Sequence, residues 1–282
     1  MVISTITWDF NPEIFSIGNH AIRWYGVMFA FGFLSGYLIF KRYLRGDRLT
    51  SEMVDSLLIH VAIGAIVGAR LGHCLFYEPE YFLRHPLQIL MVWKGGLASH
   101  GGIIGLLVAL WLYIRKFKIP FLWLMDRIAI VVALANAFIR IGNFFNSEIY
   151  GLPTNLPWGV VFVRDRLYDS TTGELLPAVP RHPTQLYEAL SYLLIFIASF
   201  VFYQKKHKNL RDGFIFSLSM IAQFSARFLI EFLKNDQVSF EAGMTFNMGQ
   251  LLSLPFILAG IAILVWTKVK PRYFSQEAFK SR

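Results

Sequence analysis

Seven apolar stretches recur along the chain, each about as long as the roughly 20-residue helix that crosses a lipid bilayer. Polar loops separate them, and no sequence repeat of fixed period stands out. This pattern predicts an all-α polytopic membrane protein with seven transmembrane helices in a single domain over residues 1–282. The expected spans are 22–41, 53–76, 97–115, 124–144, 184–203, 213–233 and 247–267.

The composition supports a membrane protein. Hydrophobic residues make up 55% of the 282 and charged residues 16%, whereas a soluble domain averages about 25% charged residues. The net charge of +9 would suggest nucleic acid in a soluble protein, but here it resides in loops, so we expect no nucleic-acid partner. A single cysteine, Cys74, excludes an intramolecular disulfide and a multi-cysteine metal site.

Basic residues are distributed unevenly among the loops. Sixteen Lys and Arg lie after the first, third and fifth stretches and in the C-terminal tail, against six in the other loops. Because cytoplasmic loops carry the excess of positive charge, the N-terminus is predicted outside and the C-terminus in the cytoplasm. The longest external loop, 145–183, contains a strand-like run at 158–163, and we expect it to form a small external head inserted between the fourth and fifth spans.

Polar and ionisable residues gather at one depth, near the outer boundary of six spans. A charged side chain inside a span costs about 2.5–3.5 kcal/mol even on a lenient scale, so a purely structural role would not predict such a layer. We interpret it as a site that handles a lipid headgroup. The layer contains Arg23, Tyr25, Arg70, Ser99, His100, Arg140, Asn143, His182, Gln185, Tyr187, Glu188, Arg227 and Glu231, with Asn146 and Glu148 directly after the fourth span.

Some members of the layer have ordinary structural explanations. Arg23, at the end of a span, is expected to extend its side chain to the interface. Arg70 fits a structural role and a phosphate contact equally well. His60 and His73 are expected to be hydrogen-bonded core histidines. The glycine pairs at 32 and 36 and at 64 and 68 are expected to allow close helix packing.

Arg140 and Arg227 have no such explanation. Two arginines at one depth on separate helices repel each other unless each is paired or both hold an anion. Glu231 follows Arg227 by four residues and can pair with it on one helix face, but nothing at that spacing compensates Arg140. A guanidinium suits bidentate phosphate recognition, which predicts a phospholipid phosphate between the two. The glycine-flanked His100 is a candidate proton acceptor, because imidazole titrates near neutral pH.

Five segments of the chain carry a family resemblance. The run RIGNFFNSEIYG at 140–151 resembles the signature of phosphatidylglycerol–prolipoprotein diacylglyceryl transferases. Segments 23–26, 95–102, 182–188 and 227–232 are similar to that family in the same order. Two positions depart from the family pattern: Ile139 stands where glycine is common, and Gln223 where an aromatic residue is expected.

The resemblance implies a reaction. The diacylglyceryl group of phosphatidylglycerol moves to the thiol of a lipobox cysteine in a preprolipoprotein signal peptide, which forms a thioether and releases glycerol phosphate. It implies no metal or organic cofactor, membrane lipid as surroundings, and a place in the bacterial inner or plasma membrane with the active site near the outer leaflet. Which residue deprotonates the thiol stays open.

The resemblance also implies roles for individual residues. Arg140 and Arg227 bind the phosphate, and His100 and Tyr25 lie at the reacting centre. The further substrate-binding residues are Gly142, Asn143, Asn146, Glu148, Gly151 and Glu231.

Other classes of membrane protein fit the sequence less well. A retinal protein needs a lysine in its last span, and 249–266 contains none. A secondary transporter shows paired repeats with a site near the midplane, and an intramembrane protease needs a catalytic constellation that the spans lack. An anion pore or a lipid-binding protein would also explain the layered arginines. Loss of activity at His100 with lipid binding intact would distinguish an enzyme from these.

Overall fold

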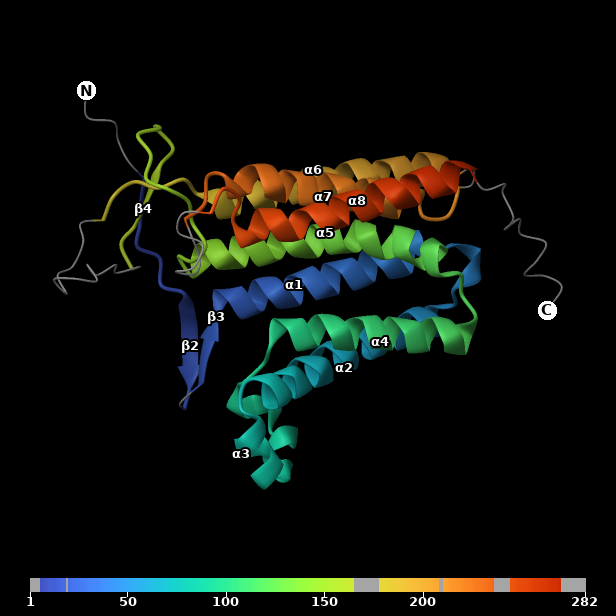
Figure 1. Cartoon of the computed structure of the whole chain (residues 1–282), viewed down its shortest axis with the longest axis horizontal. Helices are drawn as coiled ribbons and strands as arrows, with labels where there is room; N and C mark the ends of the chain where they lie inside the picture. Colours follow the sequence, from blue (N-terminus) through green and yellow to red (C-terminus); the bar gives the residue numbers. More distant parts are fainter. Residues whose placement is uncertain (1–5, 19, 165–177, 208–209, 236–243, 270–282) are drawn as a thin grey trace. The chain divides into compact units, whose positions relative to one another are not determined.

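The structure of the chain is a computed structural model that describes residues 6–18, 20–164, 178–207, 210–235 and 244–269 (Figure 1). Within these residues, seven helices are long and apolar enough to cross a membrane, so all seven predicted spans are confirmed, with no bound shifted by more than three residues. They are α1 (Trp24–Ile39) continued by a π-helical turn (Phe40–Leu44), α2 (Ser51–Phe76), α4 (Ser99–Phe117), α5 (Phe121–Phe145), α6 (Thr184–Lys206), α7 (Phe214–Glu231) and α8 (Met248–Val269).

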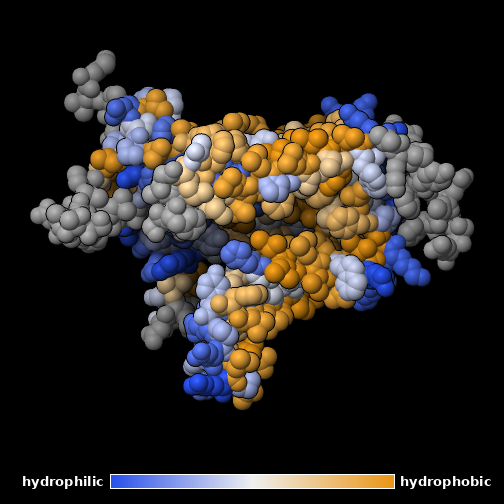
Figure 2. Space-filling model, viewed as in Figure 1, coloured by the Kyte–Doolittle hydropathy of each residue, from blue (hydrophilic) through white to orange (hydrophobic). Residues whose placement is uncertain are grey.

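The surface agrees with a multi-pass membrane protein. In Figure 2, hydrophobic side chains cover the lengths of the helices and hydrophilic side chains gather at their ends. The chain divides into two compact units. One contains residues 1–39 and 125–282, and the other contains residues 40–124.

Glycines bring the helices of the smaller unit into backbone contact. A methyl group at Gly68 would collide with the carbonyl of Gly101, and one at Gly64 would collide with Gly105 and Ala109. The helices α2 and α4 therefore approach backbone to backbone at these glycines, as small residues allow in membranes. This confirms the predicted packing role of the glycines at 64 and 68.

The sequence left two roles open for Arg70, and the contacts of its side chain are those of a structural role. Its side chain, only 4% exposed, donates hydrogen bonds of 2.5–3.2 Å to backbone carbonyls. The acceptors belong to Gln88, Ile89, Gly95 and Gly96. These residues lie in the connection from α2 to α4, which holds α3 (Pro79–Arg84) and 3₁₀ turns at Pro86–Leu90 and Val92–Lys94. Arg70 thus ties this connection to α2.

The histidines of α2 also have local partners. His60 is half-buried, lies 2.6 Å from the carbonyl of Ser56 through Nδ1 and meets the edge of the Tyr113 ring, so its expected hydrogen bond is confirmed. His73 lies 3.4 Å from a Glu78 carboxylate oxygen and stacks on Tyr77. Cys74 is a buried free thiol.

In the larger unit, α1 packs against α5 through the other predicted glycine pair. A methyl group at Gly32 would approach Ala135 Cα to 3.2 Å, and one at Gly36 would lie 3.4 Å from Val131 Cβ. This close approach confirms the expected packing role of the two glycines.

Asp126, near the start of α5, caps the N-terminus of α7. Its Oδ2 and Oδ1 accept hydrogen bonds of 2.8 Å from the backbone N–H groups of Gly213 and Phe216. The carboxylate therefore satisfies two donors that a helix start leaves unpaired.

Asp126→Asn leaves one of these two donors without its acceptor. We expect the free energy of unfolding to fall by about 1 kcal/mol, measured as a lower thermal unfolding midpoint in detergent. Asp9→Asn, which changes an exposed carboxylate paired with Arg164, is the matched control and should leave the midpoint unchanged. An equal effect of both variants would contradict the cap.

Short strands accompany the helices of the larger unit. The strand β1 (Ile6–Trp8) pairs in parallel with β4 (Val160–Phe162), and β2 (Glu13–Ile17) pairs antiparallel with β3 (His20–Arg23). The predicted strand-like run 158–163 contains β4, but its partner is the N-terminal segment, which the sequence did not indicate. A small cluster of Phe144, Tyr150, Val160 and Phe162 with Trp8 packs around this pair.

Arg23 lies directly before α1, and the expected extension of its side chain to the membrane interface stays a prediction. Arg23 ends β3 rather than lying in a span, and it forms an exposed ion pair of 3.3 Å with Glu13 on the neighbouring strand. The head as a separate insertion over 145–183 stays a prediction, and its residues 165–177 lie outside the described part.

Candidate active site

Arg140 stands near the end of α5 with its guanidinium held from two sides. Its Nε lies 2.7 Å from Oε2 of Glu188 on α6, and its Nη1 donates a hydrogen bond of 3.1 Å to Oδ1 of Asn143. No residue four positions away on α5 compensates Arg140, as the sequence indicated, and the compensating carboxylate comes from another helix. Glu188 is fully buried, so the pair is strongly coupled.

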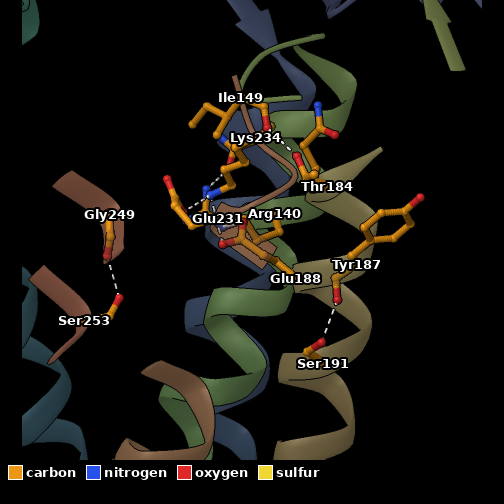
Figure 3. A network of polar contacts seen from close by, with 12 residues as sticks. Arg140, Ile149, Thr184, Tyr187, Glu188, Ser191, Glu231, Lys234, Gly249 and Ser253 are labelled. Atoms are coloured by element: carbon orange, nitrogen blue, oxygen red, sulfur yellow. Dashed lines mark hydrogen bonds and ion pairs between the residues drawn. The ribbon is translucent and has the colours of Figure 1, made fainter. Parts of the chain in front are cut away.

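Lys234, just after α7, extends this pair into a cluster of four charges (Figure 3). Its Nζ lies 3.1 Å from Glu188 Oε1 and 3.0 Å from Glu231 Oε2. Both the lysine and the two glutamates are at most 4% exposed. Positive and negative charges therefore alternate from Arg140 to Glu231 across three helices. The predicted local pair of Glu231 with Arg227 is wrong, because Lys234 occupies that carboxylate.

Asn143 connects Arg140 to a second carboxylate. While its Oδ1 accepts from Arg140, its Nδ2 donates to Oε1 of Glu148 at 2.8 Å. Asn146 donates to the same oxygen at 3.2 Å. Both asparagines thus orient Glu148, and four predicted site residues meet as one hydrogen-bonded group.

Tyr25 packs on the same part of α5. A methyl group at Gly142 would lie 2.9 Å from the ring of Tyr25, so the absence of a side chain there lets the tyrosine approach the helix. The Tyr25 hydroxyl is within electrostatic reach of Glu148 and Arg140. The structure thus brings this predicted residue beside the asparagine–glutamate group.

Gly151 lies where three segments of the chain pack closely against one another. A side chain there would collide with the Leu233 carbonyl, with His182 Cβ and with Thr184 Cγ2. Its N–H also donates a hydrogen bond of 2.8 Å to the His182 carbonyl. The structure therefore gives the predicted Gly151 a packing role, holding the segment after α5 against the entry to α6.

Arg227 differs from Arg140. Within the described part of the chain, its guanidinium has no carboxylate within 4.0 Å and no hydrogen bond. It lies on α7, and the buried Tyr192 of α6 is within electrostatic reach of both arginines. Arg140 is thus neutralised by Glu188, whereas the donors of Arg227 have no partner among the described residues.

The two departures from the family pattern occupy α5 and α7. Gln223 accepts a hydrogen bond of 3.0 Å from Asn136 on α5 and donates one of 2.9 Å to Ser219. Its amide thus joins the two helices that carry the arginines. Ile139 is half-buried on α5.

His100 is exposed in the first turn of α4. It belongs to the unit 40–124, whereas the residues above belong to the other unit. Its place at the reacting centre stays a prediction. The described residues contain no group of three or more His, Cys, Asp or Glu side chains that could hold a metal ion.

Sequence reasoning named Glu188 but not its pairing with Arg140, and it missed Lys234 and Tyr192. Glu188 and Tyr192 lie one turn apart on α6, and only the Glu188 position belonged to the polar layer. Lys234 was counted only as a loop charge. Its spacing of three residues from Glu231 indicates a pair on one face of a helical turn, and this signal could have identified it.

The fold and the site together define a polytopic membrane protein with a buried, charge-balanced polar cluster and an arginine, Arg227, whose donors have no partner in the described part of the chain. The sequence profile of the family described as prolipoprotein diacylglyceryl transferase matches residues 12–266. The chain belongs to the prolipoprotein diacylglyceryl transferase family, and the resemblance drawn from its motifs is confirmed.

Individual relatives are similar over nearly the whole chain. The phosphatidylglycerol–prolipoprotein diacylglyceryl transferase of Tolumonas auensis is 47% identical over 259 residues, which are 92% of this chain and 96% of that protein. The protein of the same name from Porphyromonas gingivalis is 44% identical over 269 residues, with 92% and 94% covered. That of Chloroherpeton thalassium is 40% identical over 268 residues, with 95% and 96% covered.

Proposed function

We propose that this enzyme transfers the diacylglyceryl group of phosphatidylglycerol to the lipobox cysteine thiol of a prolipoprotein, the first step of lipoprotein maturation. Membership of the transferase family supports the reaction. The observation that carries the assignment of the site is Arg227, whose guanidinium lacks a carboxylate partner in the described chain, whereas Arg140 is neutralised by Glu188.

The chemistry explains why a cation with free donors is needed. The thiol sulfur forms a bond to the glyceryl carbon, the carbon–oxygen bond to phosphate breaks, and the thiol proton passes to a base. The phosphodiester carries one negative charge before the reaction, and the released glycerol phosphate gains another. Cations at the phosphate therefore bind the transition state more tightly than the lipid, which accelerates the transfer.

Each residue of the site has a part in this proposal. Arg227 binds the phosphate directly, and Arg140, fixed by Glu188, presents its remaining donors to the same group. Tyr25 borders the reacting carbon. His100 accepts the thiol proton, because imidazole titrates near neutral pH.

The same proposal covers location. The protein spans the bacterial inner or plasma membrane with its N-terminus outside, because the loop charges favour that orientation. The active site then lies near the outer leaflet, where the lipid headgroup and the lipobox of a signal peptide both arrive. The segment 145–183 forms an external head on that side.

A transfer assay tests the function. Purified enzyme in phosphatidylglycerol-containing detergent micelles is given a lipobox peptide, and peptide mass and released glycerol phosphate are followed. We expect the peptide to gain one diacylglyceryl group, with one glycerol phosphate released per peptide modified. A peptide with serine in place of its cysteine is the control and should gain nothing. Lipid binding without any mass gain would leave a lipid-binding protein and contradict the proposal.

A further inference from the structure

The chain leaves α5 through a turn, residues 146–151, that contains two strained positions. Ser147 and Ile149 have φ values of 56° and 58°, in the left-handed region that residues with a side chain rarely adopt. For a β-branched residue such as Ile149 the cost is high, and such a conformation persists only where the surroundings enforce it. Glu148, which accepts the hydrogen bonds of two asparagines, lies between the two strained residues.

Two side chains from the first turn of α6 hold this turn. The Thr184 hydroxyl donates a hydrogen bond of 3.1 Å to the Ile149 carbonyl, as Figure 3 shows. The Gln185 amide donates one of 2.7 Å to the Glu148 carbonyl. Both side chains are fully buried, so water does not replace these bonds if they are lost.

These bonds are not ordinary helix caps. The residue at the start of α6 is Pro183, and no side chain caps that end of the helix. The polar ends of Thr184 and Gln185 instead cross to a segment 35 to 37 residues away in sequence. They therefore fix one segment relative to another rather than the helix that carries them.

Main-chain hydrogen bonds set the distance between the two segments. Gly151 N–H donates to the His182 carbonyl at 2.8 Å, and His182 N–H donates to the Leu152 carbonyl at 3.0 Å. The absence of a side chain at Gly151 leaves room for the methyl group of Thr184. The segment before α6 is thus anchored, and its next two side chains reach the strained turn.

We propose that Thr184 and Gln185 are positioning residues for the transfer reaction. By holding the carbonyls of the two peptide groups that flank the Cα of Ile149, they enforce the left-handed conformation of that residue. They thereby set the place of the Glu148 carboxylate relative to Asn143 and Arg140. This inference rests on the proposed function, because it assigns the two residues to that reaction.

The role requires a specific pattern of rates. Thr184→Val keeps the shape of the side chain and removes the donor, so the turn relaxes and Glu148 moves. Because small misplacements at a reacting centre are costly, we expect kcat to fall about tenfold or more, with KM for the lipid changed less than about twofold. Gln185→Met should act in the same direction. Thr184→Ser keeps the donor and should retain most of the wild-type kcat.

A second substitution separates positioning from simple packing. Glycine adopts the left-handed conformation without steric cost, so Ile149→Gly lets the turn keep its shape without the clamp. We therefore expect Ile149→Gly to restore kcat in the Thr184→Val background. Ser191→Ala is the matched control, because it removes a hydroxyl bond of 2.8 Å to the Tyr187 carbonyl on the same helix, and kcat should be unchanged.

All variants are compared in the peptide-lipidation assay with purified enzyme. Wild-type kcat in Thr184→Val would overturn the inference, as would a loss that Ile149→Gly does not restore or a large loss in Thr184→Ser. If Thr184→Val does not fold, the inference is tested by the other two variants. A wild-type kcat in Gln185→Met or a large loss of kcat in Thr184→Ser would overturn it. Absence of transfer by the wild-type enzyme would instead overturn the proposed function, and with it this role.

Discussion

Arg227→Ala is expected to lower kcat/KM for diacylglyceryl transfer by about a thousandfold while leaving the fold intact. Removal of one preorganised donor to a developing negative charge costs about two to three orders of magnitude in other enzymes, and a guanidinium supplies two donors and a full charge. Because Arg227 has no carboxylate partner in the described chain, its loss leaves no buried anion unpaired. Thermal unfolding should therefore be unchanged.

Two comparisons sharpen this prediction. Arg140→Ala should lose activity and stability together, because it strips Glu188 of a partner at 2.7 Å. Arg164→Ala, which removes an exposed arginine paired with Asp9, should change neither. A transfer rate for Arg227→Ala within tenfold of wild type, measured in phosphatidylglycerol micelles with a lipobox peptide, would contradict phosphate binding by Arg227.

Lys234→Met should give the largest loss of stability. Lys234 is the cation between two buried carboxylates, at 3.1 Å from Glu188 and 3.0 Å from Glu231. Removal of one member of a buried ion cluster costs about 3–5 kcal/mol, because the remaining charges are left uncompensated. The expected result is a much lower thermal unfolding midpoint in detergent.

The charge balance of the cluster supplies the control. Lys234→Met combined with Glu231→Gln removes one charge of each sign, so Arg140 and Glu188 again balance. This double variant should regain most of the lost stability. The change in its unfolding free energy, minus the sum of the changes in the two single variants, measures the coupling between the two residues. If the double variant unfolds as readily as Lys234→Met alone, the cluster is not held by charge balance.

The sequence predicted the seven spans closely, because lipid requires about 20 apolar residues for each helix, whatever its neighbours. It also identified Arg140 and Arg227 by the cost of charge in a span. It did not identify Glu188 as the partner of Arg140, because that pair joins different helices, and only tertiary structure decides it. The sequence did not predict the pairing of β1 with β4 for the same reason, since more than 150 residues separate Ile6 from Val160.

The local rule for helix charges also failed at one place. Spacing of four residues predicted a pair between Arg227 and Glu231, yet Lys234 takes that carboxylate from the turn after the helix. Because Glu231 pairs with Lys234 instead, Arg227 is available to the substrate in the proposed reaction.

The central claim is that the lipid phosphate binds beside Arg140 and Arg227, and a structure with phosphatidylglycerol bound tests it most directly. Without a peptide acceptor the lipid is not consumed, so the enzyme can be prepared with its substrate in nanodiscs and solved by electron cryomicroscopy. The account predicts the phosphate within hydrogen-bond distance of the guanidinium groups of both arginines. A headgroup bound elsewhere, with Arg227 still without an anion, would contradict it.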